Sequence, residues 1–325
     1  MGARSVPAAA AADFPAGGSC TIMDVATERG GRDEVTQPHV QERRKPSVER
    51  APLRAPARDW NDLLTLRTIA VANHKSGVGK TATVHALGAA LAERGRRVLL
   101  VDLDPQSTLT AFCGVESAAG TSMAEVFGGA LPGVVPLWDT LKEVVPGLYL
   151  FLAPSDLALA AAELGLISRM GREDVLRRIL STVADDFDVA ILDCPSSLGP
   201  LTVNALTAAQ AVLVPTQPHI PDLRALWFFL ATLEQIKHEL NRNIETLGIL
   251  VTQYDWRLPH HRAAVDAMRA ARLPVLPVGL GQPTAPAGAG SDQTPTYLPT
   301  NREAQAELAD MVERWLDYEK PLGSA

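Results

Sequence analysis

The chain has 325 residues, of which 46% are hydrophobic, 21% charged and 5% aromatic. This composition excludes a chain that is disordered throughout, collagen-like or membrane-spanning. The formal net charge of -7 argues against a protein that holds nucleic acid mainly through bulk positive charge. Three unclustered cysteines, Cys20, Cys113 and Cys194, indicate neither a disulfide framework nor a four-ligand metal or iron–sulfur site. We therefore expect a cytoplasmic protein.

Residues 1–65 differ in composition from the rest of the chain. They are rich in Ala, Pro, Gly and Arg, and their apolar residues follow no regular spacing, which is typical of a disordered arm. The arm holds nine basic and nine acidic residues, so the whole negative excess lies in residues 66–325, which we expect to form one folded domain. A basic stretch at 43–58 is either a solvated linker or a segment that lies along a polyanion.

From residue 67 onward, short β-branched and apolar runs alternate with longer amphipathic segments. This alternation predicts βαβ units, and hence an α/β fold with a mostly parallel, twisted sheet flanked by helices. The predicted strands are 67–73, 97–102, 148–152, 187–193, 210–215, 246–252 and 274–278. The predicted helices are 79–94, 156–165, 173–184, 199–208, 222–240, 259–272 and 301–317. Because residues 273–299 are rich in Pro and Gly, we also expect a long irregular loop there.

The strongest functional signal is the segment 74–81, His-Lys-Ser-Gly-Val-Gly-Lys-Thr, between the first predicted strand and the first predicted helix. Small residues let successive backbone N–H groups turn inward around phosphates, Lys80 can reach the β- and γ-oxygens, and Thr81 offers a hydroxyl to magnesium. The helix after the loop directs the positive end of its dipole at the anion. The segment therefore predicts a phosphate-binding loop, although His74 replaces the usual first glycine.

Two further predicted strands end in carboxylates. Asp102 and Asp104 stand at the end of the strand 97–102, and Asp193 ends the strand 187–193. Ligands of open parallel sheets collect at the carboxyl ends of the strands, so we expect these three side chains beside the phosphate-binding loop. A magnesium ion that bridges phosphates takes such oxygen ligands, usually through water.

These segments, in this order, resemble a known family. Lys-Ser-Gly-Val-Gly-Lys-Thr-Ala at 75–82, Asp-Leu-Asp-Pro-Gln at 102–106 and Asp-Cys-Pro-Ser-Ser-Leu-Gly at 193–199 are similar to the motifs of the ParA/MinD family of deviant Walker ATPases. Within that family the resemblance is to chromosome and plasmid partition ATPases of the ParA/Soj type, over about residues 67–255. The resemblance implies a P-loop NTPase fold, ATP and Mg²⁺ as ligands, and slow, partner-stimulated ATP hydrolysis.

The resemblance also implies roles for single residues. Lys75 matches the extra lysine that reaches the partner subunit's phosphates in an ATP-sandwiched homodimer, and Lys80 matches the lysine that contacts phosphates within the subunit. Asp104 matches the aspartate that positions the attacking water. The metal-side residues are Thr81, Asp102 and Asp193. The residues expected to hold the nucleotide are Lys75, Ser76, Gly77, Val78, Gly79, Lys80, Thr81 and Ala82.

The chain departs from the family pattern at several positions. Ser76 and Ala82 stand where Gly and Thr are usual, Ser107 stands where Gly is common, and Ser196 replaces a Pro. A side chain at position 76 is costly if the backbone there needs a positive φ. The family's Ile-Pro-Arg-Asn-Val-Arg segment, which helps to hold the adenine, has no match, so the choice of ATP over other nucleotides rests on the resemblance alone.

Several biological functions are compatible with such a nucleotide site. The favoured one is an ATPase that binds DNA without sequence preference and drives chromosome or plasmid partition with a ParB-type partner, in the cytoplasm and on the nucleoid. The alternative is a related ATPase that positions a protein cargo on the nucleoid through an adaptor. A MinD-like membrane regulator would need a basic amphipathic C-terminal helix, but the predicted helix 301–317 is acidic. An iron–sulfur reductase would need paired cysteine ligands.

DNA contacts are expected from basic residues of the C-terminal half, with a mixed solvated face as the alternative. These residues are Lys237, Arg242, Arg257, Arg262, Arg269 and Arg272, of which Lys237, Arg257, Arg262 and Arg269 are the predicted DNA site. Three histidines in the same half, His238, His260 and His261, are expected to cap helices or face solvent rather than to bind a metal.

Overall fold

The computed structural model of the chain describes residues 66–115, 122–128, 135–145, 149–255, 257–280 and 302–318. All of them belong to one compact unit, Ala55–Ala325. The predicted arm 1–65 lies outside the described residues, and so does most of the predicted loop, from residue 281 to 299. Within the described part of the chain, no helix combines the length and the apolarity that a membrane span requires.

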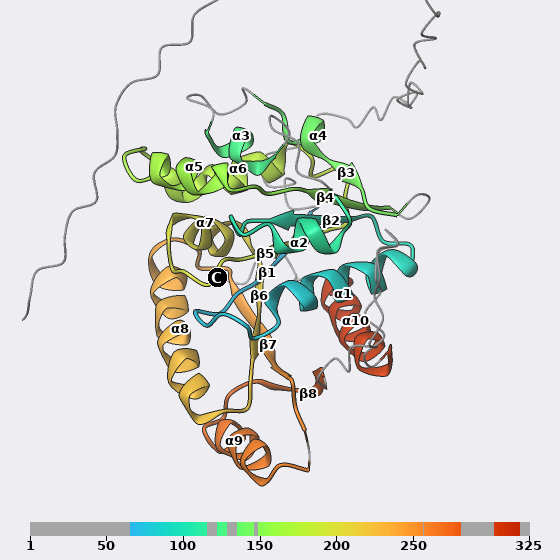
Figure 1. The fold of residues 1–325 in the computed structure, drawn as a ribbon, viewed down its shortest axis with the longest axis vertical. Helices are drawn as coiled ribbons and strands as arrows, with labels where there is room; N and C mark the ends of the chain where they lie inside the picture. Colours follow the sequence, from blue (N-terminus) through green and yellow to red (C-terminus); the bar gives the residue numbers. More distant parts are fainter. Residues whose placement is uncertain are drawn as a thin grey trace, which may run out of the picture. The chain divides into compact units, whose positions relative to one another are not determined.

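The described residues form an α/β fold around one eight-stranded sheet (Figure 1). The strand order across the sheet is β3-β4-β2-β5-β1-β6-β7-β8. Every neighbouring pair is parallel except β3 and β4, which are antiparallel. The strands are β1 (Arg67–Val71), β2 (Val98–Asp102), β3 (Lys142–Glu143), β4 (Leu150–Ala153), β5 (Val189–Asp193), β6 (Ala211–Thr216), β7 (Glu245–Thr252) and β8 (Val275–Leu280). The predicted mostly parallel sheet is therefore confirmed.

The strands β2, β5 and β6 are almost entirely apolar, as expected for strands in the interior of a parallel sheet. The sequences of β2, β5 and β6 are Val-Leu-Leu-Val-Asp, Val-Ala-Ile-Leu-Asp and Ala-Val-Leu-Val-Pro-Thr, and every residue in them is buried. Strands of a parallel sheet are covered by helices on both faces, which favours such continuous apolar runs over alternating ones. The only charged side chains in these three strands are the terminal aspartates, at the edge of the sheet where the strands end.

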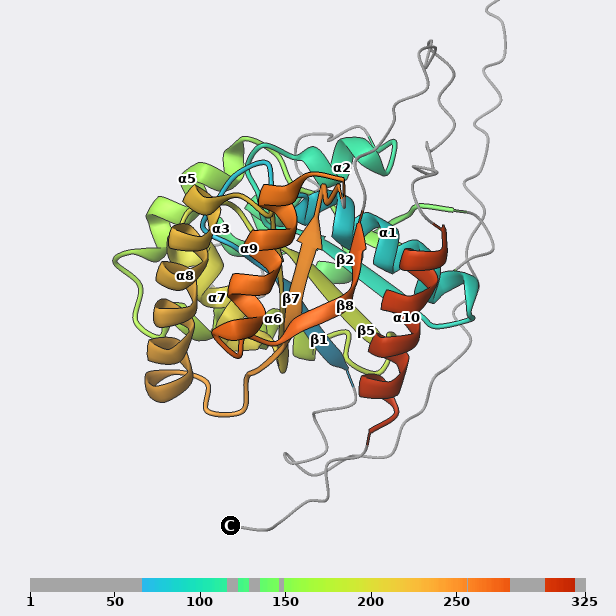
Figure 2. The ribbon, with the colours of Figure 1, turned by 90° about the horizontal axis from the view of Figure 1, so that it is seen from below.

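Helices cover both faces of the sheet, and each face has its own core (Figures 1 and 2). One face packs against α1 (Lys80–Glu93), α2 (Thr108–Phe112) and α10 (Arg302–Leu316). The other face packs against the remaining helices. These are α3 (Met123–Gly128), α4 (Leu137–Thr140), α5 (Ala158–Leu166), α6 (Val175–Ser181), α7 (Pro200–Ala208), α8 (Ile220–Glu239) and α9 (Pro259–Ala270), with a short 3-10 helix η2 (Arg172–Asp174) before α6.

All seven predicted strands and all seven predicted helices are present, with ends that differ by a few residues. The prediction omitted β3, α2, α3 and α4, which have between two and six residues each. An element of that length spans too few residues to produce a recognisable period of 2 or 3.6. These short elements form because neighbouring elements bury them, as the exposure of Met123 (0%) and Leu137 (2%) shows.

Candidate nucleotide-binding site

The strand order brings the three predicted motifs together. In the sheet, β5 lies between β2 and β1, so that Asp193 is in register with Asp102 on one side and with Val71 on the other. The phosphate-binding loop begins at His74, shortly after β1, and its last two residues, Lys80 and Thr81, are the first two of α1. The carboxylates at the ends of β2 and β5 therefore flank the loop, as the sequence predicted.

The loop conformation depends on its two glycines. Gly77 has a φ of 73° and Gly79 a φ of 84°, in the left-handed region that a residue without a Cβ enters at low cost. Ser76 is not among the described residues with positive φ. The serine at that position is therefore compatible with the loop, and the backbone strain that the substitution would cause at a positive φ does not arise.

Polar side chains from the ends of β6 and β7 hold the loop in place. The side-chain amides of Gln217 and Gln253 both donate to the carbonyl of Gly77, over 2.8 and 3.0 Å. The Thr252 hydroxyl donates to the carbonyl of Val78 over 2.8 Å. Sequence reasoning missed these three side chains, although the signal that identified the aspartates, a polar residue at the carboxyl end of a strand, applied to them as well.

Lys80 occupies the inner side of the loop. Its side chain is buried, and Nζ donates to the Lys75 carbonyl and to Ser196 Oγ, each over 3.0 Å. Burial lowers the pKa of Lys80, while the negative charges of Asp193 and Asp104 act against that shift. Ser196, which replaces the usual proline of the family, is thus an acceptor for the phosphate-loop lysine.

Asp193 is the strand-end carboxylate with unsatisfied oxygens. It is 1% exposed, and its oxygens accept no hydrogen bond of standard geometry among the described residues, although the Thr81 hydroxyl is close enough to interact with them. Burial raises its pKa to about 8, the nearby Asp102 adds to the shift, and Thr81 and Lys80 oppose it. A buried carboxylate with free oxygens, next to a threonine hydroxyl and a phosphate-binding loop, suits a magnesium ion that is bound directly or through water.

Asp102, by contrast, uses its oxygens within the protein. One oxygen accepts hydrogen bonds from the backbone N–H and the hydroxyl of Thr110, over 2.9 and 2.7 Å, and the other accepts one from the Asp104 N–H over 3.1 Å. Burial raises its pKa to about 6. The side chain therefore positions the segment that carries Asp104. In that segment Ser107 has a φ of 56°, which explains why glycine is common there.

Lys75 is turned toward α8. Its Nζ forms an ion pair with Asp222 in the first turn of that helix. The Lys75 side chain is 37% exposed, whereas the Asp222 side chain is 1% exposed, and Asp222 Oδ2 has no hydrogen-bond partner among the described residues. The second lysine of the loop is therefore held within its own subunit, on a carboxylate that sequence reasoning did not single out.

The predicted DNA residues do not form one cluster. Arg257 precedes α9 and pairs with Asp255 over 2.8 Å, and Arg262 and Arg269 are exposed on α9. Lys237 is in the last turn of α8. The start of α8 lies beside the start of α9, and at about 1.5 Å per residue Lys237 is roughly 27 Å further along the α8 axis. Arg257 and Arg262 are therefore at one end of α8 and Lys237 is at the other.

The similarity of the chain to known proteins covers this site. A family model described as an AAA domain matches residues 66–246, which is more than half of the chain. The chain is 43% identical over 192 residues to the chromosome-partitioning ATPase Soj of Thermus thermophilus, a match that covers 59% of this chain and 71% of that protein. It is 39% identical over 196 residues to Uncharacterized protein Rv1708 of Mycobacterium tuberculosis, of which it spans 61%.

A solved structure extends the similarity to three dimensions. Cobyrinic acid a,c-diamide synthase from Mycobacterium smegmatis, with a bound ATP analog and magnesium, has a TM-score of 0.67 and 38% sequence identity. The match covers 78% of this chain and 98% of that one. With the loop, the two lysines and the strand-end carboxylates in the predicted order, these similarities show that the chain belongs to the ParA/MinD family of deviant Walker ATPases.

Proposed function

We propose that the chain is a ParA/Soj-type ATPase that binds Mg²⁺ and ATP at residues 75–82 and forms an ATP-sandwiched homodimer. The dimer binds DNA without sequence preference and supports chromosome or plasmid partition with a ParB-type partner. The observation that carries the proposal is the placement of two lysines on one loop. Lys80 is buried within the site, whereas Lys75 is partly exposed and contacts α8. A phosphate site completed by one subunit needs only the first of them.

The residues divide the work of hydrolysis among them. Lys80 holds positive charge against the phosphate oxygens in a site of low dielectric, where it stabilises developing charge more than it would in water. Thr81 and Asp193 would hold Mg²⁺, which when bound neutralises charge on the phosphates. Asp104 is half-buried and directed by the Asp102 and Ser155 contacts of its backbone. There it is suited to orient a water for in-line attack.

Exposed aromatic side chains of α8, one of which lies beside the loop, support dimer formation. Trp227 and Phe228 on α8 are 50% and 58% exposed. The Phe228 ring lies 5.5 Å from the ring of His74, which precedes Lys75. A second copy of the chain that faces the nucleotide would cover this surface, whereas in a monomer two large aromatic side chains stay in water.

Lys75→Ala is expected to bind ATP with little change but to remain a monomer when ATP is added. The variant keeps Lys80 and loses the cation that would reach the partner's phosphates, together with the ion pair that this cation makes with Asp222. Light scattering with and without ATP measures the outcome, and Lys142→Ala, on the edge strand β3, is the matched control. Dimer formation by Lys75→Ala at the wild-type protein concentration would show that the loop completes its site within one subunit.

Asp104→Ala tests the whole cycle. The variant should bind ATP, hydrolyse it at least about 100-fold more slowly and accumulate as a dimer, because it loses water positioning and keeps the phosphate contacts. Phosphate release and light scattering measure both effects. Fluorescence anisotropy with random-sequence duplex then compares ATP with ADP. Asp139→Ala on α4 is the control. Absence of ATP-dependent DNA binding in both wild type and Asp104→Ala would overturn the partition function.

Other functions share nucleotide binding with the proposed one and differ in the step after it. Positioning of a protein cargo on the nucleoid would require the same ATP cycle, so the partner encoded beside the gene discriminates between cargo positioning and DNA partition.

ATP-dependent amide synthesis is a second candidate because of the similarity to cobyrinic acid a,c-diamide synthase, and ATP turnover without any DNA binding would favour it. The membrane-bound alternative gains no support, because the apolar residues Leu308, Ala309 and Val312 of α10 are buried in the core that α10 shares with the sheet.

A further inference from the structure

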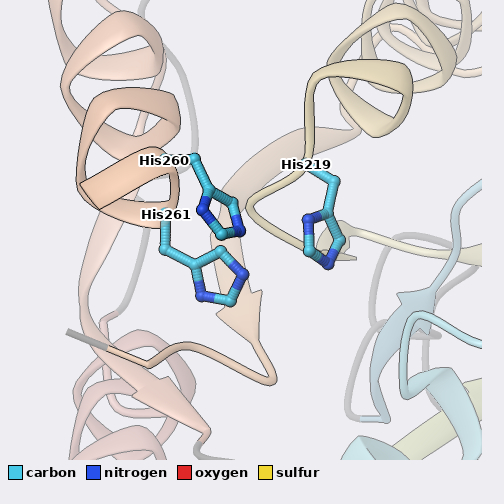
Figure 3. Close-up of side chains that lie close together, drawn as sticks. All are labelled: His219, His260 and His261. Carbon is cyan, nitrogen blue, oxygen red and sulfur yellow. The ribbon is translucent and has the colours of Figure 1, made fainter. Parts of the chain in front are cut away.

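Three histidines meet outside the nucleotide site, between the starts of two helices (Figure 3). His219 immediately precedes α8, and His260 and His261 are in the first turn of α9. One ring nitrogen from each lies within 4.8 Å of the others. The His261 ring is 4.6 Å from that of His260 and 4.9 Å from that of His219, measured between centroids. The rings thus face one shared space.

His261 does not have the contacts of an ordinary buried histidine. It is 4% exposed and its Nδ1 accepts the Asp255 N–H over 3.1 Å, but its Nε2 has no hydrogen-bond partner among the described residues. A buried polar atom without a partner is costly and is uncommon unless a ligand, ion or water satisfies it. In Figure 3 the nitrogen on the far side of the ring from Nδ1 is directed toward the other two histidines.

We propose that His219, His260 and His261 form a binding site for a divalent transition ion of the Zn²⁺ type. Imidazole nitrogen is the side-chain ligand that such ions prefer, and three imidazoles with a water complete a tetrahedral shell. In that shell the nitrogens are about 3.3 Å apart, since each Zn–N bond is about 2.0–2.1 Å. The rings have to approach by about 1.5 Å at most, which rotation of the exposed His260 and half-buried His219 side chains can supply.

Metal binding changes the tautomer of His261. While Nδ1 accepts the Asp255 N–H, the neutral ring carries its proton on Nε2. When Nε2 binds the ion, that proton leaves Nε2 and Nδ1 takes one up, so the ring remains neutral and gives up one hydrogen bond. A ligating histidine usually donates its other N–H to a carboxylate, a carbonyl or water. The Asp255 carboxylate, which also binds Arg257, is close enough to His261 to interact with it electrostatically and can accept the new Nδ1–H.

The histidine site lies on the two loops that also contact the phosphate-binding loop. His219 follows Gln217 in the loop after β6, and His260 and His261 follow Gln253 in the loop after β7. Both of these glutamines donate to the Gly77 carbonyl of the phosphate-binding loop. Asp222, which pairs with Lys75, donates its backbone N–H to the His219 carbonyl over 2.9 Å. An ion at the three histidines would therefore tie together the two loops that hold the nucleotide loop.

The test is Zn²⁺ binding by the full chain without nucleotide, so that its result is independent of the proposed ATPase function. The protein is purified without a polyhistidine tag, treated with chelator and titrated with ZnCl₂ in a calorimeter. We expect one Zn²⁺ per chain with a micromolar or lower Kd, and Co²⁺ in its place should give the visible absorption of a tetrahedral site. At a Zn²⁺ concentration of 100 times Kd, the Tm should rise by about 5 °C or more.

Variants connect binding to these side chains. His260→Ala and His219→Ala should each weaken Zn²⁺ binding at least about 100-fold, since even the loss of a group that only hydrogen-bonds to a metal ligand costs about 10- to 100-fold. His260 is exposed, so its removal does not disturb the core. His238→Ala, at the other end of α8, is the control and should bind as the wild type does. A wild type that binds no Zn²⁺, or His219→Ala and His260→Ala variants that both bind it normally, would overturn the proposal.

Discussion

Lys80→Ala is expected to reduce ATP turnover by at least about 100-fold. The ammonium is buried in the loop, and its contacts with the Lys75 carbonyl and Ser196 Oγ hold it in place before nucleotide arrives. Removing one preorganised charge donor from a site of low dielectric costs about 10²- to 10³-fold in rate. The substitution also removes the cation that opposes the raised pKa of Asp193. The carboxyl group therefore becomes harder to ionise, and the magnesium side of the site is weakened as well.

Phosphate release under saturating ATP measures the loss of turnover, and binding of a fluorescent ATP analogue measures the loss of affinity. The circular dichroism spectrum and the Tm show whether Lys80→Ala is folded. Lys142→Ala, a lysine of the edge strand β3, is the control for the removal of one positive charge. Wild-type turnover and affinity in folded Lys80→Ala would mean that the nucleotide binds elsewhere.

Arg257→Glu combined with Arg262→Glu is expected to abolish ATP-dependent DNA binding. The part of the chain after residue 65 carries the full net charge of -7, so it can approach phosphates only through a local basic surface, which the proposed ATP dimer would present twice. Arg257 already shares its charge with Asp255, and a glutamate in its place would repel both that carboxylate and DNA. If each arginine contacts one phosphate, the dimer loses four contacts. The log–log salt slope then falls by about 3.6 as affinity drops at least about 100-fold.

Anisotropy with random duplex between 50 and 300 mM salt measures both the affinity and the slope. Arg172→Glu combined with Arg177→Glu changes the net charge equally on η2 and α6 and is the control. ATP turnover without DNA should be unchanged in both double variants, since all four residues lie outside the nucleotide loop and the strand-end carboxylates. DNA binding of wild-type strength in the Arg257 and Arg262 variant would mean that this surface is only a solvated face.

Sequence alone was sufficient for the parts of the site that are local or that depend only on the fold class. Residues 75–82 are contiguous, so their spacing contains the loop chemistry before any tertiary contact forms. Asp102, Asp104 and Asp193 are distant in sequence, but each follows or ends an apolar strand. In a parallel sheet all such ends lie at the same edge. The position of these carboxylates beside the loop could therefore be predicted from periodicity and composition.

Only the tertiary structure shows which side chains from other segments contact the nucleotide loop, because no sequence motif links those segments. Gln217 and Gln253 both reach Gly77 because β6 lies beside β1 and β7 lies beside β6. The sequence pattern of a strand does not specify which strands will be its neighbours in the sheet. Lys75 pairs with Asp222 because the connection after β6 places the first turn of α8 beside the nucleotide loop. Hydrophobic periodicity indicates which face of a helix is buried, but it does not specify which polar residue of another segment will contact a given polar residue of that helix.

The histidines illustrate the same limit. His260 and His261 look like solvated residues at a helix start, and His219 has no motif around it, so the sequence predicted no metal site there. Packing places His219 beside the other two and buries His261 with one nitrogen unpartnered among the described residues. The sequence by itself determined the fold class and the nucleotide loop, because these depend on local spacing and on a rule shared by all parallel sheets. The tertiary structure decided which side chains surround that loop, because loops far apart in sequence meet only when strand order and helix packing bring them together.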